Sequence, residues 1–93
     1  MPLHFVEHPL VHDALMELRD ARTAPPAFRR AANRISVLLA TEALRDVTSV
    51  AAVVETPLGP AHGRRVTADV VVVPVLRAGL GMVEGFLRLL ADA

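Results

Sequence analysis

Three consecutive residues, Arg77, Ala78 and Gly79, stand where chemistry is expected, between an apolar run at 70–76 and a helical pattern at 80–90. A ligand of an open α/β sheet binds at the carboxyl ends of the strands. A glycine-containing turn into a helix presents backbone N–H groups and the positive end of the helix dipole, and arginine adds a planar cation. These residue types indicate an anion site for a phosphorylated small molecule. The spacing also fits an ordinary strand-to-helix turn with a surface arginine, because it lacks the usual nucleotide-loop glycines.

The segment that must position this turn is the apolar run at 70–76, which contains four consecutive valines. A strand with no polar alternation is typical of the centre of a parallel sheet, where both faces are buried. Pro74 lies near its end, where the loss of one backbone donor is tolerable. In the helix predicted over 80–90, Gly81 and Gly85 lie four residues apart on one face, which would let that helix approach a neighbour closely.

Two helices are predicted before this strand. Pro9 suits the first position of a helix over 10–22, whose apolar residues recur every three or four positions. Two prolines at 25 and 26 break that helix, because each removes a backbone donor. The second helix, over 26–46, carries a broad apolar stripe and is interpreted as a core helix.

A hairpin is predicted between these helices and the valine run. Residues 50–54 are rich in β-branched side chains, 56–60 read as a turn, and 61–66 form the returning strand.

The fold class that follows is α/β, as part of a parallel-sheet fold with two N-terminal helices, a β-hairpin, one central strand and a following helix. We predict a single unit over residues 1–93: a helical arm at 8–46, the hairpin at 48–67, and the core strand, anion loop and helix at 69–91.

Composition excludes several classes of protein. The 93 residues contain no cysteine, so there is no disulfide framework and no thiolate metal site. Ten basic and ten acidic residues balance, which argues against nucleic acid or an anionic membrane as a partner. The longest apolar run is too short to span a bilayer, and the N-terminus lacks the charged and apolar regions of a signal peptide. We therefore expect a cytoplasmic protein.

Other polar residues have simpler interpretations. Histidines at 4, 8, 12 and 62 lack metal-ligand spacing and are expected to be solvated or capping. Glu42 and Asp46 lie one helical turn apart and could form an acid/base pair, although a solvated helix face fits better. Arg64 and Arg65 could form a phosphate patch, but a hairpin surface, with subunit contact as its role, is preferred.

The anion-loop segment resembles the diphosphate-binding loop of uracil phosphoribosyltransferases, and the resemblance extends over essentially the whole chain. The matching segments, in chain order, are H-P-L-V at 8–11, L-R-D at 18–20 with R-T at 22–23, F-R at 28–29, L-L-A-T-E-A at 38–43, V-E-T-P at 54–57 and V-V-P-V-L-R-A-G-L-G-M at 72–82.

This resemblance implies transfer of the ribosyl phosphate of phosphoribosyl diphosphate to N1 of uracil, which yields UMP and diphosphate in pyrimidine salvage. It implies that Arg77 contacts the diphosphate, with help from the backbone of Ala78 and Gly79, and that the loop holds a non-proline cis peptide bond. It further implies Mg²⁺ chelated mainly by the substrate, and a homo-oligomer formed through the hairpin and the N-terminal helices. The catalytic residues themselves are not identified.

Three working segments of that family have no counterpart in this sequence: a second arginine segment, the ribose-phosphate loop D-P-M-L-A-T-G-G-S and the uracil-binding segment G-L-G-D-A-G-D. We therefore expect a chain of this length to have no transferase activity alone. Two hypotheses remain open beside a distant third, a nucleotide-sensing regulator. The chain is the N-terminal half of such an enzyme, or a non-catalytic dimerisation or docking module derived from one.

Overall fold

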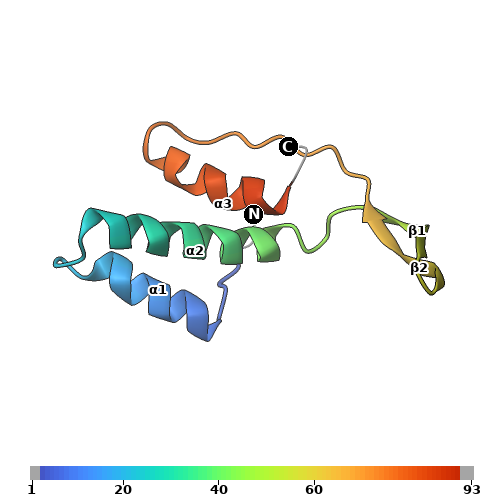
Figure 1. Ribbon diagram of the computed structural model, residues 1–93. Helices are drawn as coiled ribbons and strands as arrows, with labels where there is room; N and C mark the ends of the chain where they lie inside the picture. The colour runs from blue at the N-terminus through green and yellow to red at the C-terminus, as the bar shows by residue number, and fades with distance from the viewer. Residues whose placement is uncertain (1–2, 91–93) are drawn as a thin grey trace.

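The structure is a computed structural model that describes residues 3–90 and arranges them in successive layers (Figure 1). Helices α1 (Pro9–Arg19), α2 (Pro25–Ala43) and α3 (Val83–Leu89) stack in that order, with α2 in the middle. A 3-10 helix, η1 (Ala78–Met82), leads into α3. The sequence before it, residues 70–75, runs along the far side of α3 and is called the valine segment below. None of the helices among the described residues is both long and apolar enough to cross a membrane.

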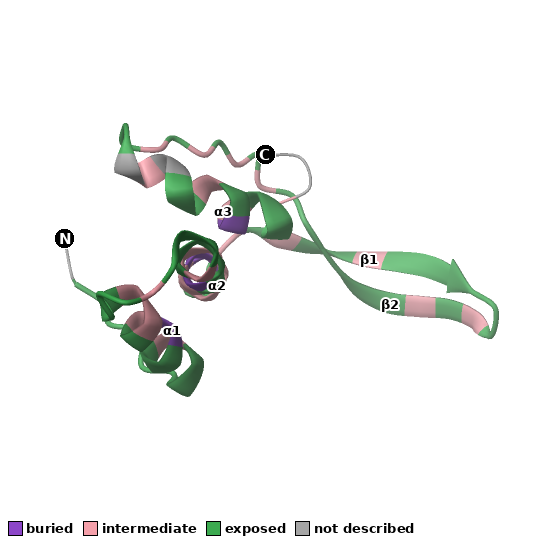
Figure 2. Ribbon diagram, turned by 60° about the vertical axis from the view of Figure 1, so that its left-hand side comes forward, coloured by how far each residue is buried: buried purple, intermediate pink, exposed green. Residues whose placement is uncertain are grey.

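Small side chains hold the helical layers together (Figure 2). The buried residues of the described chain are Ala14 of α1, Ala31, Ser36 and Ala40 of α2, and Gly85 of α3. Because the side chains at the contact set the distance between helix axes, these residues allow close packing. The buried Ser36 hydroxyl donates to the carbonyl oxygen of Ala32 at 2.8 Å, so no polar atom is left unpaired there.

The helix boundaries follow from their caps. Helix α1 begins at Pro9, as predicted, and the Nδ1 atom of His8 accepts from the backbone N–H of Leu10 at 3.0 Å. It ends at Arg19, three residues before the predicted end, because the backbone of Asp20 is already extended. Helix α2 ends at Ala43 and not at residue 46, since the chain turns there toward β1.

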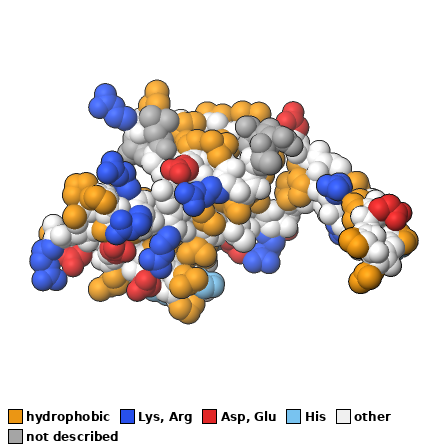
Figure 3. Space-filling model, viewed as in Figure 1, with side chains coloured by type: hydrophobic (Ala, Val, Ile, Leu, Met, Phe, Trp, Pro, Cys, Tyr) orange, Lys and Arg blue, Asp and Glu red, His pale blue; other side chains and the backbone are white. Residues whose placement is uncertain are grey.

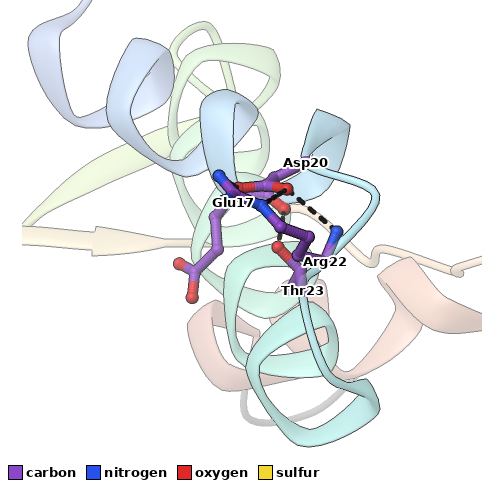
Figure 4. Close-up of polar contacts among 4 residues, drawn as sticks. All are labelled: Glu17, Asp20, Arg22 and Thr23. Atoms are coloured by element: carbon purple, nitrogen blue, oxygen red, sulfur yellow. Dashed lines mark hydrogen bonds and ion pairs between the residues drawn. The ribbon is translucent and has the colours of Figure 1, made fainter.

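The connection between α1 and α2 is a hydrogen-bonded turn (Figure 4). One carboxylate oxygen of Asp20 accepts from the backbone N–H of Arg22 at 2.9 Å and from its Nε at 3.2 Å, and the other accepts from Nη2 at 3.3 Å. The hydroxyl of Thr23 donates to the carbonyl oxygen of Glu17 at 2.6 Å. Asp20, Arg22 and Thr23 therefore shape a turn, a structural role that the family resemblance did not assign.

Replacing Asp20 with Ala is expected to lower the melting temperature at neutral pH. Hydrogen bonds from Arg22 hold the pKa of the Asp20 carboxyl below its ordinary value. A lowered folded-state pKa gives stability that is complete above the unfolded pKa, about 3.9, and is lost as the pH falls through the folded value. Thermal unfolding followed by circular dichroism should show that the difference in melting temperature between the unsubstituted protein and Asp20→Ala becomes smaller in acid. A difference in melting temperature that stays constant down to the lowest pH measured would contradict a stabilising role for the ionised Asp20 carboxylate.

The predicted hairpin is confirmed. Strands β1 (Ser49–Thr56) and β2 (Gly59–Val66) pair antiparallel, from Ser49 opposite Val66 to Thr56 opposite Gly59. Gly59 has a φ of 123°, a conformation that favours glycine, at the end of the tight turn. The hairpin projects away from the helices, and most of both strands is exposed (Figures 1 and 2).

The predicted central strand is not formed among the described residues, where the one sheet consists of β1 and β2. Exposure nonetheless alternates along the valine segment, as expected for an extended backbone. Val71, Val73 and Val75 are 76–82% exposed, so the prediction that both faces are buried is wrong for this structure. The physical reason is that a strand needs a neighbour for its backbone hydrogen bonds, and the described residues place α3 on one face and no strand on either edge.

Candidate functional site

Arg77 lies at the turn where the valine segment gives way to η1, and its side chain is exposed. None of the ion pairs within residues 3–90 involves it, which is also true of Arg19, Arg29, Arg30, Arg64 and Arg65, whereas Arg22, Arg34, Arg45 and Arg88 each pair with a carboxylate. Its guanidinium is therefore a planar cation with no acidic partner among the described residues, and it lies at the end of the extended segment, the position that the sequence predicts for an anion-binding group.

The backbone on either side of Arg77 is folded into a tight loop. The peptide bond between Leu76 and Arg77 is cis, which confirms the cis peptide expected from the family resemblance. The backbone N–H of Gly79 donates to the carbonyl oxygen of Val75 at 2.9 Å and closes the loop. In this conformation the N–H of Gly79 is engaged within the chain, so it is not free to bind a ligand.

The helix after the loop starts later than predicted. Residues 78–82 form η1, and α3 begins at Val83 instead of residue 80. Glycine is a poor helix former, and Gly79 and Gly81 both fall in this stretch. The tighter 3-10 turn therefore occupies the space between the loop and α3.

Gly85 fixes how α3 sits behind the loop. A Cβ atom at this position would lie 2.5 Å from Cβ of Ser36 and 3.0 Å from the backbone nitrogen of Val37. The prediction that a glycine lets this helix approach its neighbour is confirmed for Gly85. It is wrong for Gly81, where a Cβ would meet no atom of the described part of the chain within 4 Å.

An apolar groove of about 430 Å³ lies between the valine segment and α3. Residues 70–75 line one side of the groove, and the other side is lined by Leu44, Gly79, Met82, Val83 and Phe86. In the space-filling view, hydrophobic side chains gather along the top of the molecule, where the valine segment runs (Figure 3). The groove adjoins the loop at Gly79 and does not include Arg77, so it is a surface distinct from the cation.

The histidines do not form a metal site in the part of the chain that the structure describes. His8 caps α1, and Nε2 of His12 lies 3.0 Å from a carboxylate oxygen of Glu7, in agreement with the capping and solvated interpretation.

The remaining charged candidates are engaged in surface contacts. A hydrogen bond from Arg45 holds the pKa of Glu42 below its usual value, opposite to the shift that a general acid requires. Arg64 donates to the hydroxyl and the backbone carbonyl of Ser49 across the hairpin, at 2.9 and 2.8 Å. These residues stabilise local structure and are not brought to the loop.

An extended apolar segment that ends in an exposed arginine loop, backed by a closely packed helix, forms part of an α/β fold. The family model described as Uracil phosphoribosyltransferase matches residues 5–93. The chain therefore belongs to the uracil phosphoribosyltransferase family.

Individual relatives agree with this assignment. The chain is 49% identical to a uracil phosphoribosyltransferase of Streptomyces griseus and 44% identical to one of Thermus thermophilus, in both cases over all of its own length. Among solved structures it resembles the AQ2163 protein from Aquifex aeolicus, with a TM-score of 0.83, 29% identity and 95% of this chain covered. The match takes in 44% of the Streptomyces relative and 43% of the Aquifex chain, so this chain spans less than half of their length.

Ser36 is the structural residue that sequence reasoning missed. A polar residue is not expected in a core, yet Ser36 is 1% exposed and Gly85 packs directly against it. The signal that could have found it is its position between Ala32 and Ala40, which gives three small residues four apart on one helix.

Proposed function

We propose that this chain supplies the diphosphate-binding loop for transfer of a ribosyl phosphate from phosphoribosyl diphosphate to uracil. In that reaction a bond forms between N1 of uracil and C1 of the ribose. The C1–O bond to diphosphate breaks, its electron pair leaves with the diphosphate, and the N1 proton is released. The observation that supports the proposal is the exposed Arg77, which has no acidic partner within residues 3–90, in a chain that the family model matches over residues 5–93.

Arg77 would bind the diphosphate and stabilise the negative charge that it gains as it leaves. A guanidinium offers two parallel N–H donors to phosphate oxygens, and charge-assisted hydrogen bonds of this kind are the strong ones. Donors already in place where charge develops lower the barrier, because they need no reorganisation during the reaction. Arg77 needs no rearrangement of an existing ion pair among the described residues before it can bind.

The backbone at Ala78 and Gly79 is proposed to assist. A side chain at Gly79 would make ordinary contacts of 3.6–3.7 Å with Pro74 and Val75, and its φ is not positive, so the loop does not itself require glycine there. Because glycine has no side chain, it would let a phosphate come close to the backbone at this position. The N–H of Gly79 could contribute only after its bond to Val75 opens.

Mg²⁺ is proposed to arrive with phosphoribosyl diphosphate. Around Arg77 the loop offers no carboxylate, and no group of three His, Asp or Glu within residues 3–90 could hold a metal ion. The residues present therefore fit an ion held by substrate oxygens and not by a protein site, in keeping with the reluctance of Mg²⁺ to lose its waters. When bound with the diphosphate, the ion would share the charge that Arg77 neutralises.

A second candidate role, as an interaction module, is favoured by the hairpin. Val50, Val53, Val54 and Leu58 are 42–101% exposed on an arm that projects from the helices (Figure 1). Such an arm suits association with another copy of the chain, and we propose a homo-oligomer on this basis. A cytoplasmic location is proposed because phosphoribosyl diphosphate and uracil are small soluble substrates.

The proposed function is tested with a chimera in which residues 5–93 replace the matched part of the Streptomyces griseus enzyme. This joins the chain covalently to the part of the relative that lies outside the match. Formation of UMP from uracil, phosphoribosyl diphosphate and Mg²⁺ is the measurement. We expect UMP from the chimera and none from the 93-residue chain alone.

A further inference from the structure

The place of Arg77 in the molecule depends on how the helices that follow it dock on α2. η1 begins at the residue after Arg77, α3 follows η1 without a break, and both contact α2. Gly85 of α3 is buried, Ser36 of α2 is 1% exposed, and a Cβ atom on Gly85 would lie 2.5 Å from that of Ser36. The backbone of α3 therefore lies closer to α2 at this point than a residue with a side chain would allow.

The loop before η1 is attached to the same helices. The backbone N–H of Gly79 donates to the carbonyl oxygen of Val75 at 2.9 Å, and Gly79 and Val83 line one side of the groove that the valine segment lines on the other. The exposed side chain of Arg77 takes part in none of the ion pairs within residues 3–90. Its position is therefore set by the backbone, through the docking of η1 and α3, and not by an ion pair of its own.

We propose that Gly85 and Ser36 are positioning residues for the diphosphate site: their close contact sets the position of α3 and, through η1, the position of Arg77. Both residues are buried, so they act through Arg77 and not by contact with a substrate. This inference rests on the proposed function, because the position of Arg77 matters for the reaction only if it binds the diphosphate.

A side chain at Gly85 would displace the loop by enough to matter. Carbon atoms make their best non-bonded contacts at about 3.5–4.0 Å, so a methyl group 2.5 Å from Cβ of Ser36 would move α3 outward by about 1 Å. Because η1 joins α3 directly to Arg77, the guanidinium would move as well. A guanidinium binds phosphate through two parallel N–H donors, and a misplacement of about 1 Å can lower a rate on the order of a hundredfold.

Ala14 offers a matched control for stability. It is 0% exposed on α1, and α1 contacts α2 on the side away from α3 (Figure 2). Ala14→Val adds methyl groups to a filled site and, like Gly85→Ala, is expected to lower the melting temperature. It leaves the contact between α2 and α3 in place, so it separates a loss of stability from a displacement of Arg77.

The experiment measures KM for phosphoribosyl diphosphate in the chimera that carries residues 5–93 in the Streptomyces griseus enzyme. Gly85→Ala should raise this KM at least about tenfold and leave KM for uracil unchanged, because only the diphosphate contact is displaced. Ala14→Val should leave both KM values unchanged.

A compensating substitution tests the contact itself. Adding Ser36→Gly to Gly85→Ala removes the Cβ atom at 2.5 Å and leaves backbone contacts of 3.0–3.1 Å, so KM of the double variant should lie between those of Gly85→Ala and the unsubstituted chimera. Glycine inside a helix is itself destabilising, so a recovered KM would not come from a stiffer helix. A role in stability alone does not predict this recovery.

Backbone amide resonances of the 93-residue chain give a readout that does not depend on activity. Gly85→Ala should shift the resonances of Arg77 and Gly79 further than Ala14→Val does, because the loop moves with α3. The double variant should return them part of the way.

The outcomes separate this proposal from the proposed function. An unchanged KM for phosphoribosyl diphosphate in a folded Gly85→Ala chimera, an equal rise in Ala14→Val, or loop resonances that stay in place each overturn the positioning role. If Gly85→Ala does not fold, a double variant whose KM equals that of the unsubstituted chimera overturns it as well. An unsubstituted chimera that forms no UMP contradicts the proposed function instead, and the amide resonances then decide whether the contact positions the loop.

Discussion

Replacing Arg77 with Ala in the chimera is expected to lower kcat/KM for phosphoribosyl diphosphate by about ten- to a hundredfold. A hydrogen bond to a charged group contributes about 1.5–3 kcal/mol, and each 1.4 kcal/mol corresponds to a factor of ten. Because the Arg77 side chain is exposed and unpaired within the described residues, its removal should leave the melting temperature unchanged. The measurement is steady-state formation of UMP, with unfolding followed in parallel.

Two further variants separate geometry from charge. Arg77→Lys keeps the positive charge but loses the planar fork of donors, so its kcat/KM should lie between those of the unsubstituted chimera and Arg77→Ala. Arg65→Ala removes an exposed arginine from the hairpin, opposite Val50, and should leave kcat/KM unchanged. If Arg77→Ala retains full kcat/KM, or if Arg65→Ala has an equal effect, then Arg77 does not bind the diphosphate.

Replacing Gly85 with Ala is expected to destabilise the protein by about 1–3 kcal/mol, the usual effect of forcing a methyl group into a filled site. The new Cβ would lie 2.5 Å from Cβ of Ser36 and 3.1 Å from its backbone carbonyl carbon, so α3 must move away from α2. In a chain of this size, 1 kcal/mol lowers the melting temperature by about 4–8 °C. Urea unfolding of the 93-residue chain gives the free energy directly.

Gly81→Ala is the matched control for this prediction. Among the residues that the structure describes, a Cβ at Gly81 meets no atom within 4 Å, and its φ is not positive, so the folded state accommodates alanine. Alanine also restricts the unfolded chain, which should raise stability by about 0.4–1 kcal/mol. The explanation by close packing predicts opposite signs at the two glycines. Equal destabilisation at both would contradict the explanation by close packing against Ser36.

Local signals in the sequence were sufficient for the helices and the hairpin. Pro9 and the prolines at 25 and 26 mark helix starts, because the proline ring itself fixes a helical φ angle. In the same way, Gly59 marks the hairpin turn, because glycine readily adopts a positive φ. The end of α1 was harder to predict, because it depends on the Asp20 carboxylate, which accepts a hydrogen bond from the backbone N–H of Arg22. Boundaries set by such side-chain competition are not visible in a pattern of apolar residues.

The valine segment is a case in which the local sequence did not predict the structure. Its composition predicts a strand buried on both faces, but a strand forms only when another strand lies beside it. In the described residues none does, and the segment stays extended and half-exposed against α3. The contact between Ser36 and Gly85 was likewise hidden, because it depends on which faces of α2 and α3 meet in space.

The candidate anion loop was predicted from residue types and family resemblance together. The order of an apolar run, an arginine and a glycine places a cation at the end of a strand, and the structure leaves Arg77 exposed and unpaired within residues 3–90. The bond from Gly79 to Val75 could not be anticipated, since it depends on the backbone conformation of the whole loop.

The most direct test of this account is the rate of UMP formation by the chimera, compared with that of the unmodified Streptomyces griseus enzyme under the same conditions. If residues 5–93 provide a working diphosphate loop, kcat/KM should lie within about tenfold of the parent value, a difference in barrier of no more than about 1.4 kcal/mol. A chimera that unfolds cooperatively, as the parent does, yet forms no UMP above background would contradict the claim that this chain carries the diphosphate site of a uracil phosphoribosyltransferase.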